Sequence, residues 1–148
     1  MRLRDILKDK DSTLYAIDGD ADIKTAACKL TDHRIGAIVI LDKDDHLQGI
    51  LSERDISKAV GSDDSAATAG PVSSIMTRDV ITCHPDHEIS ELFHIMVDNN
   101  IRHLPVMEND RVVGMLSIRD ISRALVKHYE SENRDLKNLI VALNVNAA

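Results

Sequence analysis

The chain has 148 residues, of which 43% are apolar, so it can form one compact domain or two small ones that share a core. A formal net charge of −7 and an aromatic content of 2% argue against a nucleic-acid-binding protein, which needs clustered cations for phosphates and rings for stacking. No apolar run approaches the roughly 20 residues of a membrane span, and the start, MRLRDILKDKD, lacks the apolar stretch of a signal peptide. Cys28 and Cys83 are isolated, as in proteins of a reducing compartment. We therefore expect a cytoplasmic protein that does not enter a membrane.

The predicted elements occur twice along the chain, in the same order. Each copy has a short strand that ends at a turn marked by Gly19 or Pro85, then an amphipathic helix, two antiparallel strands and a second helix. In the first copy, strands are predicted at 13–17, 37–41 and 47–52, and helices at 23–30 and from residue 52 onward. In the second copy, strands are predicted at 79–83, 103–107 and 112–116, and helices at 89–97 and from residue 117 onward. The segments MRLRDILKD and VSSIMTRD are also similar, so each copy is expected to own a short leading helix.

The two copies are most alike in GILSERDISKA, residues 49–59, and GMLSIRDISRA, residues 114–124. Such a repeat indicates two copies of one supersecondary unit. We place the first repeat at 1–62 and the second at 72–127. The segment between them, 63–71, is rich in small and polar residues and is predicted to be a linker.

The last predicted helix continues beyond its own repeat into an extension at 128–148. A helix of about 25 residues extends nearly 40 Å, which is too long for contact with one small repeat alone. We therefore expect its end to pack on another subunit, in a homodimer. The apolar positions behind this prediction are Ile121, Leu125, Tyr129, Leu136, Leu139, Ile140 and Leu143.

The motifs IGAIVILD with GILSERDI, and IRHLPVME with GMLSIRDI, resemble those of paired cystathionine β-synthase (CBS) domains, often called a Bateman module. The resemblance implies an α+β fold of two β-α-β-β-α repeats, packed sheet to sheet about a pseudo two-fold axis. It also implies a disc-shaped dimer and clefts for adenosine-containing ligands such as AMP, ADP, ATP, S-adenosylmethionine or NAD. Among these ligands we expect AMP, ADP or ATP ahead of NAD or S-adenosylmethionine. No enzyme domain is identifiable beside the repeats, so the expected role is regulatory and not catalytic. The sequence does not name the regulated protein.

A serine and an aspartate stand three residues apart at the start of the second helix in each copy. Ser52 with Asp55 and Ser117 with Asp120 fit a capping box, in which side chains satisfy the free backbone N–H groups. A helix start also favours anions, and a carboxylate there can accept two hydrogen bonds from a ribose diol. The family resemblance implies ribose contacts at these same residues, so all four are predicted to bind ligand.

The copies differ at the start of the first hairpin strand, where Gly36 and Ala37 correspond to Arg102 and His103. A guanidinium beside an imidazole suits phosphate recognition, so we predict that Arg102 and His103 bind phosphate and count Pro105 of the same strand with the site. The alternative is a solvated pair at an edge. A phosphate beside His103 would raise the pKa of its imidazole above the unperturbed value of about 6.5, so nucleotide affinity would be greatest at mildly acid pH.

Other functions receive less support. CHPDH could suggest a metal site, but Pro85 predicts a turn and Asp86 an N-cap, and His46 has no partner at ligand spacing, so no metal is predicted. No nucleophile with a neighbouring base is identifiable, which leaves an enzyme such as a slow nucleotide hydrolase without residues to support it. The alternative to a ligand sensor is a structural dimerisation module with no ligand.

Overall fold

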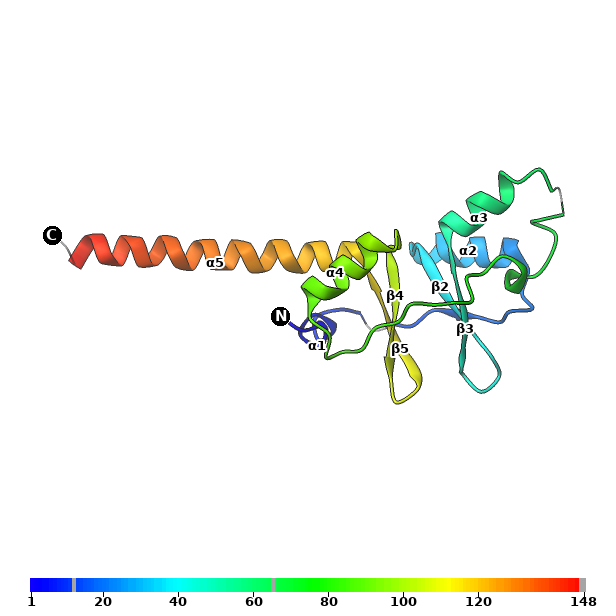
Figure 1. Ribbon diagram of the computed structural model, residues 1–148, viewed down its shortest axis with the longest axis horizontal. Coiled ribbons are helices and arrows are strands. Elements are labelled where there is room, and N and C mark those ends of the chain that lie inside the picture. The colour runs from blue at the N-terminus through cyan, green and yellow to red at the C-terminus, as the bar shows by residue number, and fades with distance from the viewer. Residues whose placement is uncertain (12, 65, 147–148) are drawn as a thin grey trace.

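The computed structural model describes residues 1–11, 13–64 and 66–146. Residue 65 of the predicted linker and residues 147–148 of the predicted extension lie outside this part. Two small lobes lie side by side, and one long helix projects from the second lobe (Figure 1). The elements are α1 (Leu3–Leu7), β1 (Ala16–Ile17), α2 (Ile23–His33), β2 (Ala37–Leu41), β3 (Leu47–Ser52), α3 (Glu53–Val60), the 3-10 turn η1 (Val72–Ser74), α4 (Ile89–Asp98), β4 (His103–Glu108), β5 (Arg111–Ser117) and α5 (Ile118–Asn146).

Each lobe is built on an antiparallel hairpin. The first lobe has the three-stranded sheet β1-β2-β3, in which β1 runs parallel to β2, and the second has the two-stranded sheet β4-β5. β2 and β4 bury consecutive side chains on both faces, and their β-branched residues, such as Val39 and Val106, favour strand over helix. The α+β fold class and the two predicted strand pairs are confirmed.

The strand predicted at 79–83 is wrong, because only Cys83 pairs, through a parallel bridge to Val106. The Cys83 N–H donates to the Pro105 carbonyl at 2.9 Å, and the Met107 N–H donates to the Cys83 carbonyl at 2.7 Å. The next bond of a parallel ladder would need an N–H on Pro105, which proline lacks. The ladder therefore stops after one residue.

The leading segments are exchanged between the lobes. Leu3 of α1 is fully buried in the core of the second lobe, and its N–H donates to the His87 carbonyl at 2.9 Å. Conversely, Val72 of η1 is fully buried in the core of the first lobe, and its N–H donates to the Ala21 carbonyl at 2.8 Å. The expected short leading helix is present in each copy, as α1 and the 3-10 turn η1, but each one packs on the lobe of the other copy. The lobes are tied together twice, since each core needs residues from the other half of the chain.

α5 has 29 residues, of which only the first turns pack on the second lobe. Ile121 is fully buried there and Leu125 is partly buried against the same core. From Val126 onward the large apolar side chains are exposed, and Figure 1 shows the helix leaving the body of the molecule. The predicted long final helix is confirmed. None of the helices in the described residues combines the length and the apolar character that crossing a membrane requires.

Candidate functional site

A cleft of about 990 Å³ runs between the lobes and includes the N-terminal ends of α3 and α5. It brings together six of the seven residues predicted as ligand-binding, which are Ser52, Asp55, Arg102, His103, Ser117 and Asp120. Ser52 and Ser117, which are 65 positions apart in sequence, thus share one cavity because the two hairpins stand next to each other. The seventh, Pro105, is buried in β4 and is not among the lining residues. Contact of any of these residues with a ligand remains a prediction.

The capping boxes predicted at the two helix starts are confirmed. Ser52 N–H donates to Asp55 Oδ2 at 2.8 Å, and Asp55 N–H donates to Ser52 Oγ at 3.3 Å. Ser117 N–H donates to Asp120 Oδ2 at 2.8 Å, and Asp120 N–H donates to Ser117 Oγ at 3.2 Å. Each pair satisfies two backbone donors reciprocally. In both pairs the carboxylate is thereby held at the cleft, and the hydrogen bonds from the serine engage its Oδ2 atom.

The two carboxylates differ in what else they bind. Lys10 Nζ lies 2.6 Å from Asp120 Oδ2 and also donates to the Met115 carbonyl. Burial raises the pKa of Asp120, but the hydrogen bonds from Lys10 and Ser117 and the charge of Lys10 outweigh it, so this pKa lies below its usual 3.8. No ion pair involves Asp55 among the described residues. Asp55 is therefore the freer acceptor.

Sequence reasoning missed Lys10. It lies 110 residues before Asp120, on the segment that leads from α1 in the second lobe back to β1 in the first. The only signal that could have found it is the exchange of leading segments, which no local pattern reveals. Lys10 lines the cleft together with its partner, so a ligand at Asp120 meets a cation already there.

His103 lies against the first lobe at the point where the copies differ. A Cβ atom built on Gly36 would be 2.9 Å from His103 Cε1 and 3.1 Å from His103 Nε2, closer than side chains normally approach. The absence of a side chain at Gly36 thus makes room for the imidazole. His103 is partly buried, which contradicts the alternative of a solvated edge residue, whereas Arg102 is exposed.

The reference pKa assumed for His103 needs correction. Burial lowers the pKa of this imidazole to about 4, the charges of Arg102, Lys10 and Arg119 act in the same direction, and Asp120 opposes them. His103 is therefore neutral at neutral pH in the ligand-free chain. An anion bound beside His103 would raise the imidazole pKa from a starting value of about 4 and not from 6.5.

The cleft is more positive than the chain that forms it. It is lined by seven cations, Lys10, Arg34, Arg54, Lys58, Arg102, Arg119 and Arg123. Four acids also line it, Glu53, Asp55, Asp79 and Asp120. Seven minus four leaves a local excess of three positive charges, against a net charge of −7 for the whole chain. A cleft of one sign concentrates ligands of the other sign, so this cavity suits an anion.

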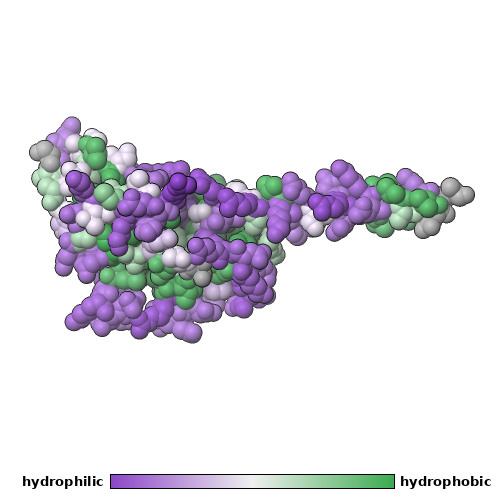
Figure 2. Space-filling model, turned by 180° about the vertical axis from the view of Figure 1, so that it is seen from behind, coloured by the Kyte–Doolittle hydropathy of each residue, from purple (hydrophilic) through white to green (hydrophobic). Residues whose placement is uncertain are grey.

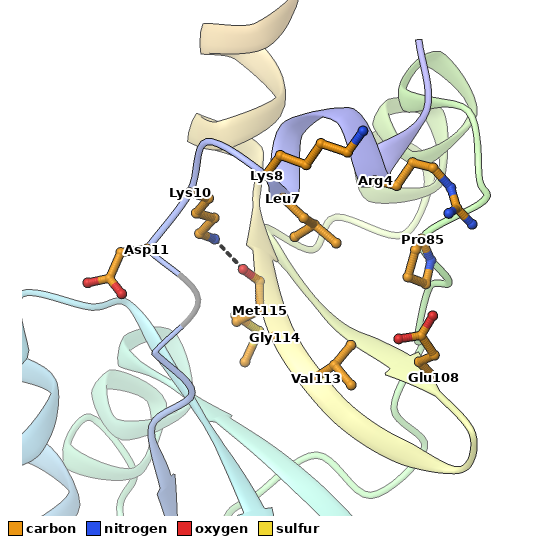
Figure 3. A pocket seen from close by; sticks show the side chains of 10 residues that line it. All are labelled: Arg4, Leu7, Lys8, Lys10, Asp11, Pro85, Glu108, Val113, Gly114 and Met115. Carbon is orange, nitrogen blue, oxygen red and sulfur yellow. Dashed lines mark hydrogen bonds between the residues drawn. The ribbon is translucent and has the colours of Figure 1, made fainter.

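A second, smaller cavity of about 330 Å³ lies between α1 and β5 (Figure 3). Its floor includes Gly114, where an added Cβ would meet no atom of the described chain within 4 Å. At the matching position of the first lobe, a Cβ on Gly49 would be 2.6 Å from Met76 Sδ. Met76, on the segment exchanged into the first lobe, thus fills the space beside Gly49. The segment of α1, which is exchanged into the second lobe, leaves the matching space beside Gly114 open.

Two details of the predicted turns are wrong. Asp86 is not an N-cap: α4 begins after Glu88, and the Asp86 carboxylate pairs with Arg4 of the exchanged α1. His46 does have partners at ligand spacing, because its side chain lies within 4.8 Å of the carboxylates of Asp42 and Asp44. The Asp42 carboxylate already accepts from the backbone N–H groups of Asp44 at 2.8 Å and His46 at 2.9 Å. The cluster is accounted for as a hydrogen-bonded turn.

Comparison with known proteins agrees with this geometry. The family model of the CBS domain matches residues 3–62 and 72–127. The chain belongs to the CBS domain family. Its structure is similar to the crystal structure of the CBS-domain protein ATU1752 from Agrobacterium tumefaciens, at 36% identity, with a TM-score of 0.80 and coverage of 84% of this chain and 98% of that one.

Two similar CBS structures contain adenosine-type ligands. The CBS domain pair of protein MJ0100, in complex with 5′-methylthioadenosine and S-adenosyl-L-methionine, is 30% identical, with a TM-score of 0.77 and coverage of 86% of this chain and 98% of that one. The CBS domain protein PAE2072 from Pyrobaculum aerophilum, complexed with AMP, is 28% identical, with a TM-score of 0.71 and coverage of 81% and 89%. The CBS domain pair thus includes members that bind adenosine compounds with and without a phosphate.

Proposed function

We propose that this CBS domain pair is a regulatory, non-catalytic module that binds an adenine nucleotide, AMP, ADP or ATP, in the cleft between its lobes. The observation that carries the proposal is the meeting of both Ser-x-x-Asp helix starts in one cavity with an excess of three positive charges. The similar protein PAE2072 supports the ligand class, since it was crystallised with AMP. The open volume of about 990 Å³ favours a ligand over a purely structural role.

The asymmetry of the cleft favours one orientation of the nucleotide. Asp55 carries no ion pair among the described residues and is the better acceptor for the ribose hydroxyls. Arg102, Arg119 and Lys10 lie on the side of the second lobe and suit the phosphates. A phosphate would also compete with Asp120 for Lys10. The ligand would therefore bridge the lobes, with its ribose on the first and its phosphates on the second.

A ligand that touches both lobes can act as a signal. It favours the relative arrangement of the lobes that it binds best, and a regulated protein that contacts the module responds to that shift in population. The proposal includes a homodimer as the unit of signalling and a cytoplasmic location, where adenine nucleotides and reduced cysteines occur together.

Titration calorimetry tests the proposal with AMP, ADP, ATP, S-adenosylmethionine and adenosine on one preparation. The phosphorylated ligands should bind more tightly than adenosine or S-adenosylmethionine, and Asp55→Asn should weaken all of them because the ribose is common to them. Asp32→Asn, an exposed carboxylate outside the cleft, is the matched control and should leave affinity unchanged. No heat and no rise in melting temperature with any of the five ligands would contradict the proposal and favour the structural alternative.

A further inference from the structure

α5 carries a largely apolar stripe with coiled-coil spacing, which starts at Leu125 and continues into the part of the helix beyond the second lobe, residues 128–146. From Leu125 the stripe advances in alternating steps of four and three residues, which is the a and d pattern of a heptad. Its members are Leu125, Tyr129, Glu132, Leu136, Leu139 and Leu143. Leu136 is 60% exposed and Leu139 is 55% exposed. Figure 2 shows the hydrophobic residues gathered at the far end of this helix.

The stripe continues the face by which α5 packs on its own lobe. Ile121 is fully buried and Leu125 is partly buried against the second-lobe core. A heptad stripe drifts only about 20° around the helix in each repeat, so Leu136 and Leu139 still point to nearly the same side as Leu125. The second lobe therefore covers the start of the stripe at Leu125 and leaves the later positions, such as Leu136 and Leu139, exposed.

A second copy of the chain is the occupant that this stripe fits. The segment NLIVALNVN, residues 138–146, contains no charged residue, so a strongly charged partner would find nothing to pair with. A two-fold axis allows one apolar stripe to serve as both surfaces of an interface. At 1.5 Å per residue, residues 128–146 are about 28 Å long, enough for several apolar layers.

We propose that two copies pair through this stripe with their helices antiparallel. In a parallel pair, the partner helix would run beside residues 118–125 on the side where the second lobe already packs. A parallel pair would also set the two Glu132 carboxylates against each other in the same layer, where like charges repel. In an antiparallel pair the bodies lie at opposite ends, and Glu132 faces the partner's Leu143.

Glu132 is tolerated in this arrangement because it has a local polar partner on its own helix. His128 Nε2 lies 3.2 Å from Glu132 Oε1, one helical turn away. Both side chains are exposed in the single chain, at 46% and 58%. In the antiparallel pair they lie near the end of the paired segment, where water still reaches them. The proposal rests on α5 alone and does not depend on what the cleft binds.

Light scattering on the full chain tests the pairing, with a matched pair of variants. Leu139→Glu places a carboxylate in the stripe and should raise the dimer dissociation constant by at least about tenfold. Asn138→Glu adds the same charge one residue away, off the stripe, and should leave the dimer intact. Circular dichroism should show both variants folded, because neither position contacts the lobes. A monomeric parent chain, or a Leu139→Glu variant that dimerises like the parent, would overturn the proposal.

Spin labels test the direction of the helices. In a Cys28→Ser background, which removes the exposed cysteine, single cysteines replace Glu130, Asn138 or Val145. Cys83 is buried and burial raises the pKa of its thiol to about 12, so it should not take up label. An antiparallel pair centred near residues 137–138 gives axial separations of about 22 Å at 130 and 145 but only about 2 Å at 138. Equal label separations at all three positions would mean a parallel pair and would overturn the proposed direction.

Discussion

The two lobes carry the same strand, turn and helix start, yet the chain surrounds them differently. In the first lobe, Gly49 is covered by Met76, and Asp55 has no ion pair among the described residues. In the second, Gly114 opens on a cavity, and Asp120 is paired with Lys10. The difference comes from the exchanged leading segments, which are similar in sequence but follow different paths after their first turns. A repeated motif therefore repeats its local hydrogen bonds and not its surroundings.

The largest expected effect tests the exchange itself. Leu3→Ala should lower the free energy of unfolding by roughly 2 to 5 kcal/mol, because it leaves a cavity in the core of the second lobe. Urea unfolding measures it, with Val97→Ala as a control, since Val97 is 56% exposed and should cost little. Equal stabilities of the two variants would contradict the burial of α1 in the second lobe.

The next effect separates the two carboxylates. Asp55→Ala should weaken binding of AMP by about ten- to a hundredfold, because it removes charge-assisted hydrogen bonds worth roughly 1.5 to 3 kcal/mol. Asp120→Ala should weaken it by less than about tenfold, because the loss of Asp120 releases Lys10 for the phosphate. Calorimetry on both variants decides. A larger loss for Asp120→Ala would reverse the proposed orientation of the nucleotide.

A third pair of variants compares the glycines. Gly49→Ala should destabilise the chain by roughly 1 to 3 kcal/mol, because the new Cβ would lie 2.6 Å from Met76 Sδ and 2.8 Å from the Thr77 carbonyl oxygen. Gly114→Ala should change stability by less than about 0.5 kcal/mol, since the methyl group would enter the open cavity. The comparison is made by thermal or urea unfolding under one set of conditions. Similar losses at both positions would mean that the second lobe is as closely covered as the first.

The smallest effect concerns His103 and pH. Its imidazole has a pKa of about 4 in the folded chain and about 6.5 when unfolded, so between these values the unfolded chain holds more protons. Stability should therefore be lost as the pH falls from 6.5 towards 4, by roughly 1 to 2 kcal/mol from this residue. Unfolding at pH 7.5 and 4.5 measures the loss. His103→Gln should lose less, and an equal loss in both proteins would contradict the burial of the imidazole.

The same residue makes a prediction for binding. A phosphate beside His103 would raise the pKa of the imidazole in the complex above about 4. The resulting gain in affinity would be complete at low pH and would be lost as the pH rises through the pKa of the complex. AMP affinity should show this dependence, while adenosine, which has no phosphate, should not. His103→Gln removes it and leaves only the titration of the phosphate itself.

Much of the candidate site could be predicted from the sequence, because its parts are local. Ser52 and Asp55 are three residues apart, so their reciprocal hydrogen bonds follow from the backbone of one helix turn, and the same holds for Ser117 and Asp120. The hairpins follow from short apolar strands bounded by polar turns, which pair with their nearest neighbour in the chain. These features recur in both copies because they depend on residues close together in sequence.

The rest depends on contacts between distant residues, and only the tertiary structure decided it. The sequence around Leu3 does not determine in which core this side chain is buried, because both lobes offer an apolar core. Its burial in the second lobe depends on how the two lobes pack together. The packing of α1 on the second lobe brings Lys10 to Asp120, 110 residues away. The packing of one lobe against the other sets His103 against Gly36, and the burial of the imidazole lowers its pKa. Burial and charge at a site are sums over everything that surrounds it in space. The sequence by itself therefore determined the repeated elements and their caps, and the packing of the lobes determined which carboxylate is free and which histidine is neutral.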